Sequence, residues 1–222
     1  MIKTTQSHSP AIDGVQTPTQ ERARRTMIRI LDSTEELLAH SPVDSLALGA
    51  VLKNAGVSNG AFYSRFRDRE ALIAALFDRF RVRSALSIEE NLDLENWKGR
   101  SPREPVAALV RVLMQLYREQ GGLIRALRDL ARHQSVYRTA AADMITETSR
   151  SLARALYAAT WRKPSPAFED EVRFAVRVLF AFLDQALLFG PLSPDKRERA
   201  DREIETRLIG LMLKSIGLGQ LL

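Results

Sequence analysis

Apolar residues recur at three- and four-residue steps along most of the chain, and this spacing predicts amphipathic α-helices. The first expected helix starts near residue 20 and ends before Ser41-Pro42, because the residue that precedes a proline disfavours helical dihedral angles. Its buried stripe is made by Met27, Ile30, Leu31, Thr34, Leu37 and Leu38.

Three more helices are expected before the middle of the chain. Two short ones cover about residues 46–54 and 58–66, on either side of Gly56, and a longer one covers about residues 68–88. Residues 90–100 then interrupt the periodicity with Asn, Trp and Gly. We therefore expect a domain boundary after residue 88. The apolar face of the longer helix consists of Leu72, Ile73, Leu76, Phe77 and Phe80.

Three Ser-Pro pairs occur in the second half of the chain, at residues 101–102, 165–166 and 193–194. Each pair places a capping hydroxyl before a proline at the first helical position, and together they predict helix starts near residues 102, 166 and 194. Ser101 and Glu104 also fit a capping box. Gly121-Gly122 and residues 133–135 are expected to divide the stretch between the first two starts. Strand-like alternation of useful length is absent from the sequence, so the predicted fold is all-α with about nine helices.

Composition narrows the classes of function. The chain has 222 residues, no cysteine and three histidines without ligand spacing, so we expect no disulfide, metal site or cofactor. A net charge of +6 permits nucleic-acid binding. Residues 1–19 are polar and are expected to form a disordered arm rather than a signal peptide. Without an apolar run that could span a bilayer, we expect a cytoplasmic protein with no membrane partner.

The candidate chemistry lies between Val51 and Phe66. Gly56 permits a left-handed turn between the two short helices, and Ser58 can cap the second one. Phe62 and Phe66 lie one helical turn apart and anchor that helix, which leaves a small and polar face opposite them. Such residues near a helix N-terminus allow close approach to base edges in the major groove of DNA. An ordinary helical hairpin with a glycine turn explains the short turn motif about equally well.

The wider context resembles the tetracycline-repressor (TetR) family over about residues 20–83. An arginine-bearing start leads into the apolar first helix, and the segments 55–58, 60–63 and 66–72 follow in the family's order. The resemblance implies a three-helix helix-turn-helix DNA-binding domain over residues 20–88 and a ligand-binding and dimerisation domain over residues 89–222. It further implies a homodimeric repressor on a near-palindromic double-stranded DNA operator, released by a small, largely apolar effector.

The same resemblance implies roles for individual residues. Tyr63 would bind the DNA backbone, Arg69 would meet a phosphate, and residues 59–61 would enter the groove. The arginines at residues 22–25 have a solvated basic face as an equal alternative. The full set of DNA-contact candidates is Arg22, Arg24, Arg25, Ser45, Ser58, Asn59, Gly60, Ala61, Tyr63, Ser64, Arg65 and Arg69.

Three positions depart from the family. Ala47 stands where a threonine commonly caps the second helix and touches phosphate, and Ser45 is the candidate substitute. Leu52 stands four residues before the turn glycine, where a small residue usually lets the two helices cross closely. Arg65 stands where an aromatic residue or histidine is frequent.

Apolar and aromatic side chains in the second half are candidates for an effector pocket, although core packing is the commoner role of such residues. His133 and Tyr137 stand out because they bring polar atoms into an apolar neighbourhood. The candidates are Met114, Tyr117, Leu123, Leu127, His133, Tyr137, Met144 and Phe174.

Residues 174–189 are hydrophobic nearly all round, so more than one face of this helix is expected to be buried. The last helix repeats the pattern, and two such helices from each subunit would form a four-helix dimer interface. A fully internal helix is the alternative. The interface candidates are Val178, Phe182, Leu208, Leu211 and Met212.

Two other function classes remain open at this stage. An enzyme would need converging catalytic side chains, and the sequence supplies only His133, tyrosines and scattered carboxylates, so no enzymatic activity is expected. The acidic run at residues 169–171 suits the first turn of a helix better than a catalytic dyad. A helical adaptor would instead use its apolar last helices to capture a different protein.

Overall fold

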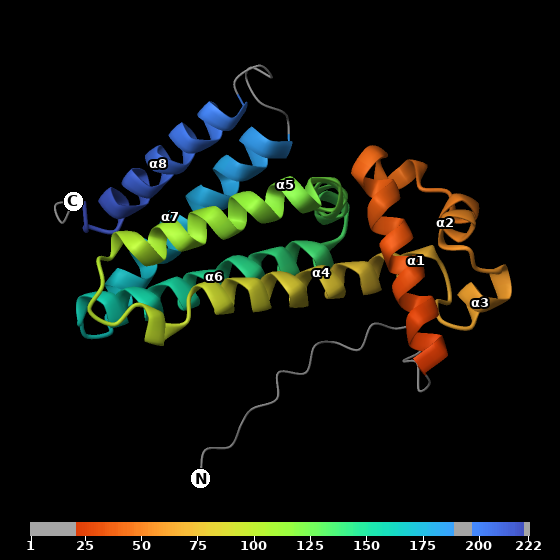
Figure 1. Ribbon diagram of the computed structural model, residues 1–222, viewed down its shortest axis with the longest axis horizontal. Helices are drawn as coiled ribbons and strands as arrows, with labels where there is room; N and C mark the ends of the chain where they lie inside the picture. Colours follow the sequence, from red (N-terminus) through yellow and green to blue (C-terminus); the bar gives the residue numbers. More distant parts are fainter. Residues whose placement is uncertain (1–20, 189–196, 220–222) are drawn as a thin grey trace, which may run out of the picture. The chain divides into compact units, whose positions relative to one another are not determined.

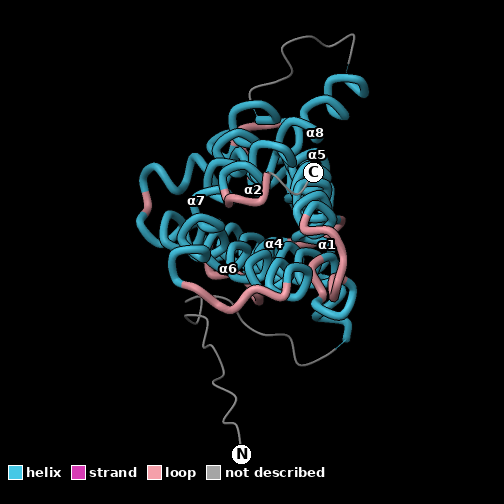
Figure 2. The backbone as a smooth tube through the Cα atoms, turned by 90° about the vertical axis from the view of Figure 1, so that its left-hand side faces the viewer, coloured by secondary structure: helices cyan, strands magenta, loops and turns pink. Residues whose placement is uncertain are grey.

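The computed structural model describes residues 21–188 and 197–219, and within these ranges it consists of helices joined by loops, with no strand (Figure 2). The expectation of an all-α fold is confirmed, with eight α-helices among the described residues. The expected arm at residues 1–19 and the expected helix start at 194 lie outside them. The α-helices are α1 (Glu21–His40), α2 (Leu48–Ala55), α3 (Asn59–Tyr63), α4 (Arg69–Asn91), α5 (Arg103–His133), α6 (Ser135–Thr160), α7 (Pro166–Leu183) and α8 (Arg197–Ser215).

The chain divides into two compact units, and the division falls after Phe80, inside α4. The first 12 residues of α4 therefore belong with α1, α2 and α3, and the rest belongs with α5 to α8. The sequence placed the boundary several residues later, where the helical periodicity stops. The loss of periodicity shows where a helix ends. The division into units depends instead on which side chains pack together, and this changes in the middle of α4.

The core of the first unit is built on the predicted stripe of α1. Ile30, Leu31, Thr34 and Leu38 are buried, while Met27 and Leu37 are half-buried. The stripe meets fully buried aromatic and aliphatic side chains from α3, the segment after it and α4. These are Phe62, Phe66, Leu72 and Leu76.

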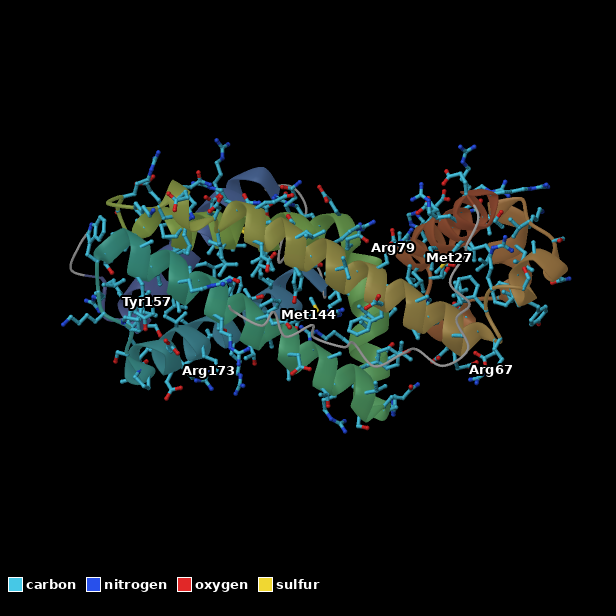
Figure 3. All side chains as sticks on the ribbon, turned by 90° about the horizontal axis from the view of Figure 1, so that it is seen from below. Met27, Arg67, Arg79, Met144, Tyr157 and Arg173 are labelled. Atoms are coloured by element: carbon cyan, nitrogen blue, oxygen red, sulfur yellow. The ribbon has the colours of Figure 1, made fainter. Side chains whose placement is uncertain are left out.

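Polar contacts also join α1 to its neighbours. The buried Ser33 hydroxyl donates to the Val51 carbonyl of α2 at 2.9 Å. Arg79 extends from α4 (Figure 3) and forms ion pairs with Asp32 at 2.6 Å and with Glu35 at 2.8 Å, both on α1. Arg79 and Glu35 are mostly shielded from water, so this pair is screened less than a surface ion pair.

The second unit is a helical bundle in which α5 packs against α6 and α8, and α7 packs against α6 and α8 (Figure 1). Its interior is aliphatic, as the sequence pattern predicts. Leu109, Leu113, Leu152, Leu156 and Leu179 are all at most 1% exposed.

Helix boundaries in this unit follow the capping signals in part. The Ser101 amide donates to the Glu104 carboxylate at 3.2 Å, which is one half of the expected capping box. Gln134 separates α5 from α6, and Pro166 starts α7, as predicted. The expected division at Gly121-Gly122 corresponds to a kink, at which two helical segments join within α5. The helix continues with a kink at Gln120 (φ −116°, ψ 17°), because buried side chains on both sides of the kink hold it against the bundle.

No helix in the described ranges is both long enough and apolar enough to cross a membrane.

Candidate nucleic-acid interface

The turn between α2 and α3 depends on Gly56, which has a left-handed conformation with φ 62° and ψ 42°. The Gly56 amide donates to the Lys53 carbonyl at 3.2 Å, and the Val57 amide donates to the Leu52 carbonyl at 3.1 Å. This pair of bonds is a Schellman motif, which satisfies carbonyls at the end of α2 and redirects the chain sharply. The predicted helix-turn-helix is therefore built with the expected turn glycine.

Ser58 starts α3 by capping it. Its hydroxyl oxygen accepts a hydrogen bond from the Ala61 amide at 3.2 Å, as expected for an N-cap. Phe62 and Phe66 are fully buried, with ring centroids 5.3 Å apart. A five-residue helix has little stability of its own, so these two rings and the cap hold α3 in place.

The side chains on the other side of α3 face solvent. Asn59, Gly60, Tyr63 and Ser64 are exposed, and Ala61 is half-buried. Tyr63 is 57% exposed, and its ring packs edge-on against Phe62 at 5.2 Å. The surface thus combines small and polar residues at the N-terminus of the helix with one exposed phenol, a hydrogen-bonding group suited to a phosphate oxygen.

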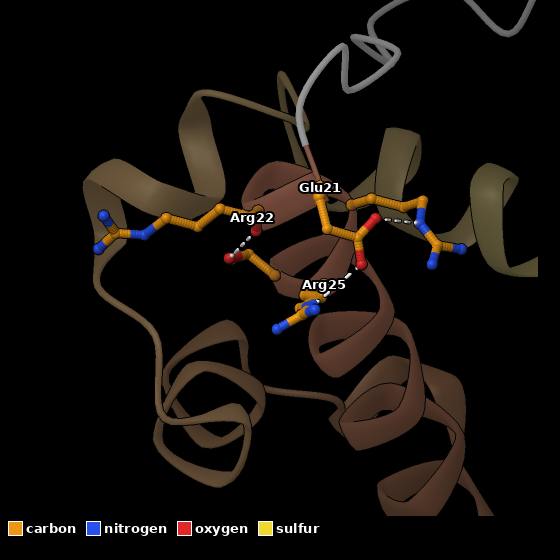
Figure 4. Close-up of polar contacts among 5 residues, drawn as sticks. Glu21, Arg22 and Arg25 are labelled. Carbon is orange, nitrogen blue, oxygen red and sulfur yellow. Dashed lines mark hydrogen bonds and ion pairs between the residues drawn. The ribbon is translucent and has the colours of Figure 1, made fainter.

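The start of α1 carries exposed arginines (Figure 4). Arg24 and Arg25 pair with Glu21 at 3.2 Å and 2.9 Å, and these two hydrogen bonds lower the pKa of the Glu21 carboxyl. The Arg22 guanidinium points away from this group. Three cations against one carboxylate leave the first turn positive, although a positive helix N-terminus disfavours cations.

Two of the predicted phosphate-contacting arginines are turned into the protein instead. Arg69 donates to the Val43 carbonyl and is half-buried. Arg65, also half-buried, donates to the carbonyls of Ala23 and Ala61. Motif position alone indicated a basic side chain near DNA, but backbone carbonyls within reach compete for the guanidinium donors.

The start of α2 lacks the side-chain cap that a threonine commonly provides in the TetR family. Ala47 is its N-cap and provides no side-chain bond. The Ser45 hydroxyl donates to the Pro42 carbonyl at 2.8 Å, so it closes its own turn and does not replace the missing cap. Leu52 is accommodated in the core of the first unit with 6% exposure.

In the second unit, the effector candidates separate by burial. Met114, Tyr117, Leu123, Leu127 and Tyr137 are buried, and Met144 is half-buried. His133 and Phe174 are exposed, Phe174 by 60%, and this differs from the expectation that both line an interior pocket. His133 is the last residue of α5, where a side chain projects past the core.

A polar cluster that the sequence did not indicate surrounds Tyr117. Its hydroxyl donates to the Asp184 carboxylate at 2.6 Å, and Arg128 donates to the same carboxylate at 3.1 Å and 2.9 Å. Burial, followed by the Asp184 charge, raises the pKa of Tyr117. The cluster joins α5, on both sides of its kink, to the π-helical turn Asp184–Leu188 after α7. Local sequence spacing could not predict this cluster, because its members are up to 67 residues apart.

Described residues of the second unit line two shallow grooves. One, of about 320 Å³, is lined by Met114 and by charged residues of α5 and α8. The other, of about 290 Å³, lies between the end of α4, the following turn and α6. Within the described ranges, no three His, Asp or Glu side chains converge as metal ligands would.

The dimer candidates also divide into two groups. Phe182 and Leu211 are 39% and 51% exposed, and Val178 is half-buried. Leu208 and Met212 are at most 3% exposed and pack in the core of their own subunit, which differs from the expectation. Phe174 belongs with the exposed group, since it precedes Val178 and Phe182 at helical spacing on α7.

Residues 30–76 match the family model described as "Bacterial regulatory proteins, tetR family". This segment runs from α1 through the turn and α3 into α4. Over residues 30–76 the chain matches the TetR family.

Two relatives extend the family match. The HTH-type transcriptional regulator AcrR of Shigella flexneri is 32% identical over 98 residues, which are 44% of this chain and 43% of that regulator. The HTH-type transcriptional regulator TtgR of Pseudomonas putida is 24% identical over 188 residues, covering 80% of this chain and 85% of the relative. The chain thus spans less than half of AcrR and most of TtgR.

Solved structures agree with the TetR fold. A transcriptional regulator of Streptomyces coelicolor A3(2) gives a TM-score of 0.63 at 19% identity, covering 86% of this chain and 98% of its own. A TerR/AcrR-family regulator of Aquifex aeolicus VF5 gives 0.61 at 19% identity, covering 85% and 98%. At this identity the likeness concerns the fold alone.

Proposed function

We propose that this protein is a homodimeric DNA-binding transcriptional regulator, present in the cytoplasm, which represses by occupying a near-palindromic operator. The observation that carries the proposal is the family match over residues 30–76, which coincides with a capped helix-turn-helix whose exposed side chains are small and polar. The two relatives are named transcriptional regulators, which supports the same conclusion.

In this proposal α3 is the recognition helix. Asn59, Gly60 and Ala61 at its N-terminus approach base edges, while Tyr63 and Ser64 contact the backbone. The arginines at residues 22–25 add non-specific attraction to phosphates. A two-fold axis relates the two recognition helices, which then read successive major grooves about 34 Å apart.

We also propose that a small, largely apolar effector binds the second unit and lowers operator affinity. Such an effector acts only if it binds the state that does not fit the operator better than the state that does. Support comes from the aliphatic core of this unit and from the polar cluster at Tyr117 and Arg128, which lie on either side of the kink in α5.

The test is selection of binding sites from a random double-stranded DNA library with the purified full chain. The proposal predicts enrichment of a sequence with two-fold symmetry and an affinity that falls as salt concentration rises. Recovery of no preferred sequence would contradict it.

A Tyr63→Ala variant extends the test. The side chain is 57% exposed, so its removal should leave the fold intact and weaken binding to all sequences by about tenfold, as loss of a backbone contact does. A change at Asn59 should instead alter which sequence is preferred. If the Tyr63→Ala variant bound as well as the unmodified protein, the proposed backbone contact would be wrong.

A further inference from the structure

Arg65 lies two residues after the end of α3 and binds the protein through three hydrogen bonds. Its Nε donates to the Ala23 carbonyl at 3.1 Å, and its Nη1 donates to the Ala61 carbonyl at 2.5 Å and to the Ser64 hydroxyl at 2.8 Å. The side chain is half-buried. The guanidinium is therefore committed to backbone and hydroxyl acceptors on two helices.

These bonds join two segments that are far apart in the sequence. Ala23 lies in the first turn of α1, 42 residues before Arg65. The same turn carries the exposed Arg22, Arg24 and Arg25. One side chain thus connects the recognition helix to the cationic start of α1, within the first unit.

Because α3 is short, the hydrogen bonds from Arg65 to the start of α1 can determine the direction of this helix. The helix has five residues, and its cap and its buried rings fix its start and its inner face. Neither of these contacts reaches the start of α1 by a hydrogen bond. The planar fork of a guanidinium holds acceptors on two helices in a fixed geometry, whereas an ammonium is a compact point charge on a flexible stem.

We propose that Arg65 is a positioning residue that sets the direction of α3 relative to the start of α1, and that it is not a phosphate ligand. This inference rests on the proposed DNA-binding function. It departs from the role that motif position suggests, because a phosphate contact would require Arg65 to give up its bonds to Ala23 and Ala61.

The experiment compares Arg65→Met and Arg65→Lys with Arg25→Met, using the full chain. Arg25 is 75% exposed and serves as a matched loss of one charge at a candidate phosphate contact. Affinity is measured on the selected operator and on unrelated DNA across a salt series, and stoichiometric titration corrects for the active fraction.

Both Arg65 variants should lose about tenfold or more in operator affinity while binding to unrelated DNA is retained. The salt slope should stay close to that of the unmodified protein. Arg25→Met should weaken both kinds of binding and reduce the slope by about 1. Recovery of operator affinity by Arg65→Lys, or a slope reduced by about 1 in Arg65→Met, would overturn the proposal in favour of a phosphate contact.

A readout without DNA separates failure of this inference from failure of the proposed function. Hydrogen exchange of the backbone amides from Phe62 to Phe66 should be several-fold faster in both Arg65 variants than in Arg25→Met, at unchanged exchange in the second unit. Unchanged exchange in this segment would overturn the positioning role, whether or not an operator is found. An unmodified protein that selects no DNA would instead refute the proposed function.

Discussion

Gly60 is the second residue of α3, and a Cβ atom added there would meet no protein atom within 4 Å. Packing within the chain therefore does not require glycine at this position. Glycine is also a poor helix former, so its presence lowers the stability of a helix that is already short. The proposed approach of the helix backbone to DNA would account for both observations.

For Gly60→Ala we expect unchanged or slightly higher stability, by up to about 1 kcal/mol, because alanine is the better helix former. Operator affinity should fall by about tenfold, because the methyl group occupies space needed at the base edges. Thermal unfolding and a binding titration check the two effects. Gly210→Ala is the matched control, since it also adds a methyl group in open space on a helix, and it should not affect DNA binding. Equal operator binding by the two variants would contradict the prediction.

At single positions, the sequence predicted what depends on local geometry. The turn at Gly56, the cap at Ser58 and the burial of Phe62 and Phe66 follow from helical spacing and backbone requirements, and all are present. The orientation of long cationic side chains could not be predicted in this way. Arg65 finds an acceptor 42 residues away, which no local pattern encodes.

At the scale of elements, the turn between α2 and α3 requires a left-handed backbone conformation at Gly56, and substitution of this glycine measures what that requirement contributes to stability. For Gly56→Ala we expect a loss of about 1 kcal/mol in the free energy of unfolding, since alanine resists the left-handed conformation at φ 62°. Crowding is not the cause, because an added Cβ would meet only the Arg29 guanidinium at 4.0 Å. Gly56→Asn should lose less, because asparagine tolerates this conformation better. Urea unfolding provides the measurement, and equal stability of the three proteins would refute the prediction.

The contact between α5 and the turn after α7 gives a pH-dependent prediction. Burial raises the pKa of Tyr117, so the folded protein keeps a proton that the unfolded chain releases above about pH 10. Its contribution to stability is complete below that pH and is lost as pH rises further. Tyr117→Phe should lower stability at pH 7 by about 1–2 kcal/mol and should flatten the decline above pH 10.

Denaturant midpoints from pH 7 to 11 measure both parts. Tyr63→Phe is the control, because its exposed ring should contribute little to stability. Parallel declines for Tyr117→Phe and the unmodified protein would rule out Tyr117 as the source.

Among whole elements, helix type and most helix starts were predictable, since amphipathic spacing and Ser-Pro caps are local signals. The break near Gly121-Gly122 was also predictable, but its form as a kink within α5 was not, because it depends on the buried side chains on both sides of the kink. The polar cluster of Tyr117, Arg128 and Asp184 depends on packing between helices, which a single sequence does not reveal.

At the scale of the whole molecule, the exposed apolar side chains of α7 and α8 are the candidates for the interface of the proposed dimer. Phe174, Phe182 and Leu211 are 60%, 39% and 51% exposed, so burying them against a second copy would be favourable. The half-buried Val178 continues the row on α7. Leu208 and Met212 instead pack in the core of their own subunit. An amphipathic helix buries one stripe of side chains within its subunit, so only its other side chains can contact a partner.

The double variant Phe182→Asp, Leu211→Asp should be monomeric at concentrations where the unmodified chain is a dimer, because two charges would be buried at the interface. It should remain folded, since both side chains are exposed in the subunit. Operator affinity should also fall, because the two half-sites would no longer be bound together. Sedimentation velocity gives the assembly state.

Trp161→Asp is the control for this variant. Its side chain is the most exposed of the described large apolar residues, at 74%, but it lies in the loop between α6 and α7. It should leave the dimer intact. A double variant that sediments as the unmodified chain does would exclude this surface as the interface.

The continuity of α4 across the division after Phe80 limits how this protein can be recombined with its relatives. No loop separates the two halves at which a different second half could be joined. An α-helix rotates by about 100° per residue, so a junction displaced by one residue would turn every later side chain of the helix to a new side. Only exchanges that keep the helical phase, such as an insertion of about seven residues, would preserve both sets of contacts. A functional hybrid of this chain and a relative should therefore need a junction that keeps the helical phase of α4.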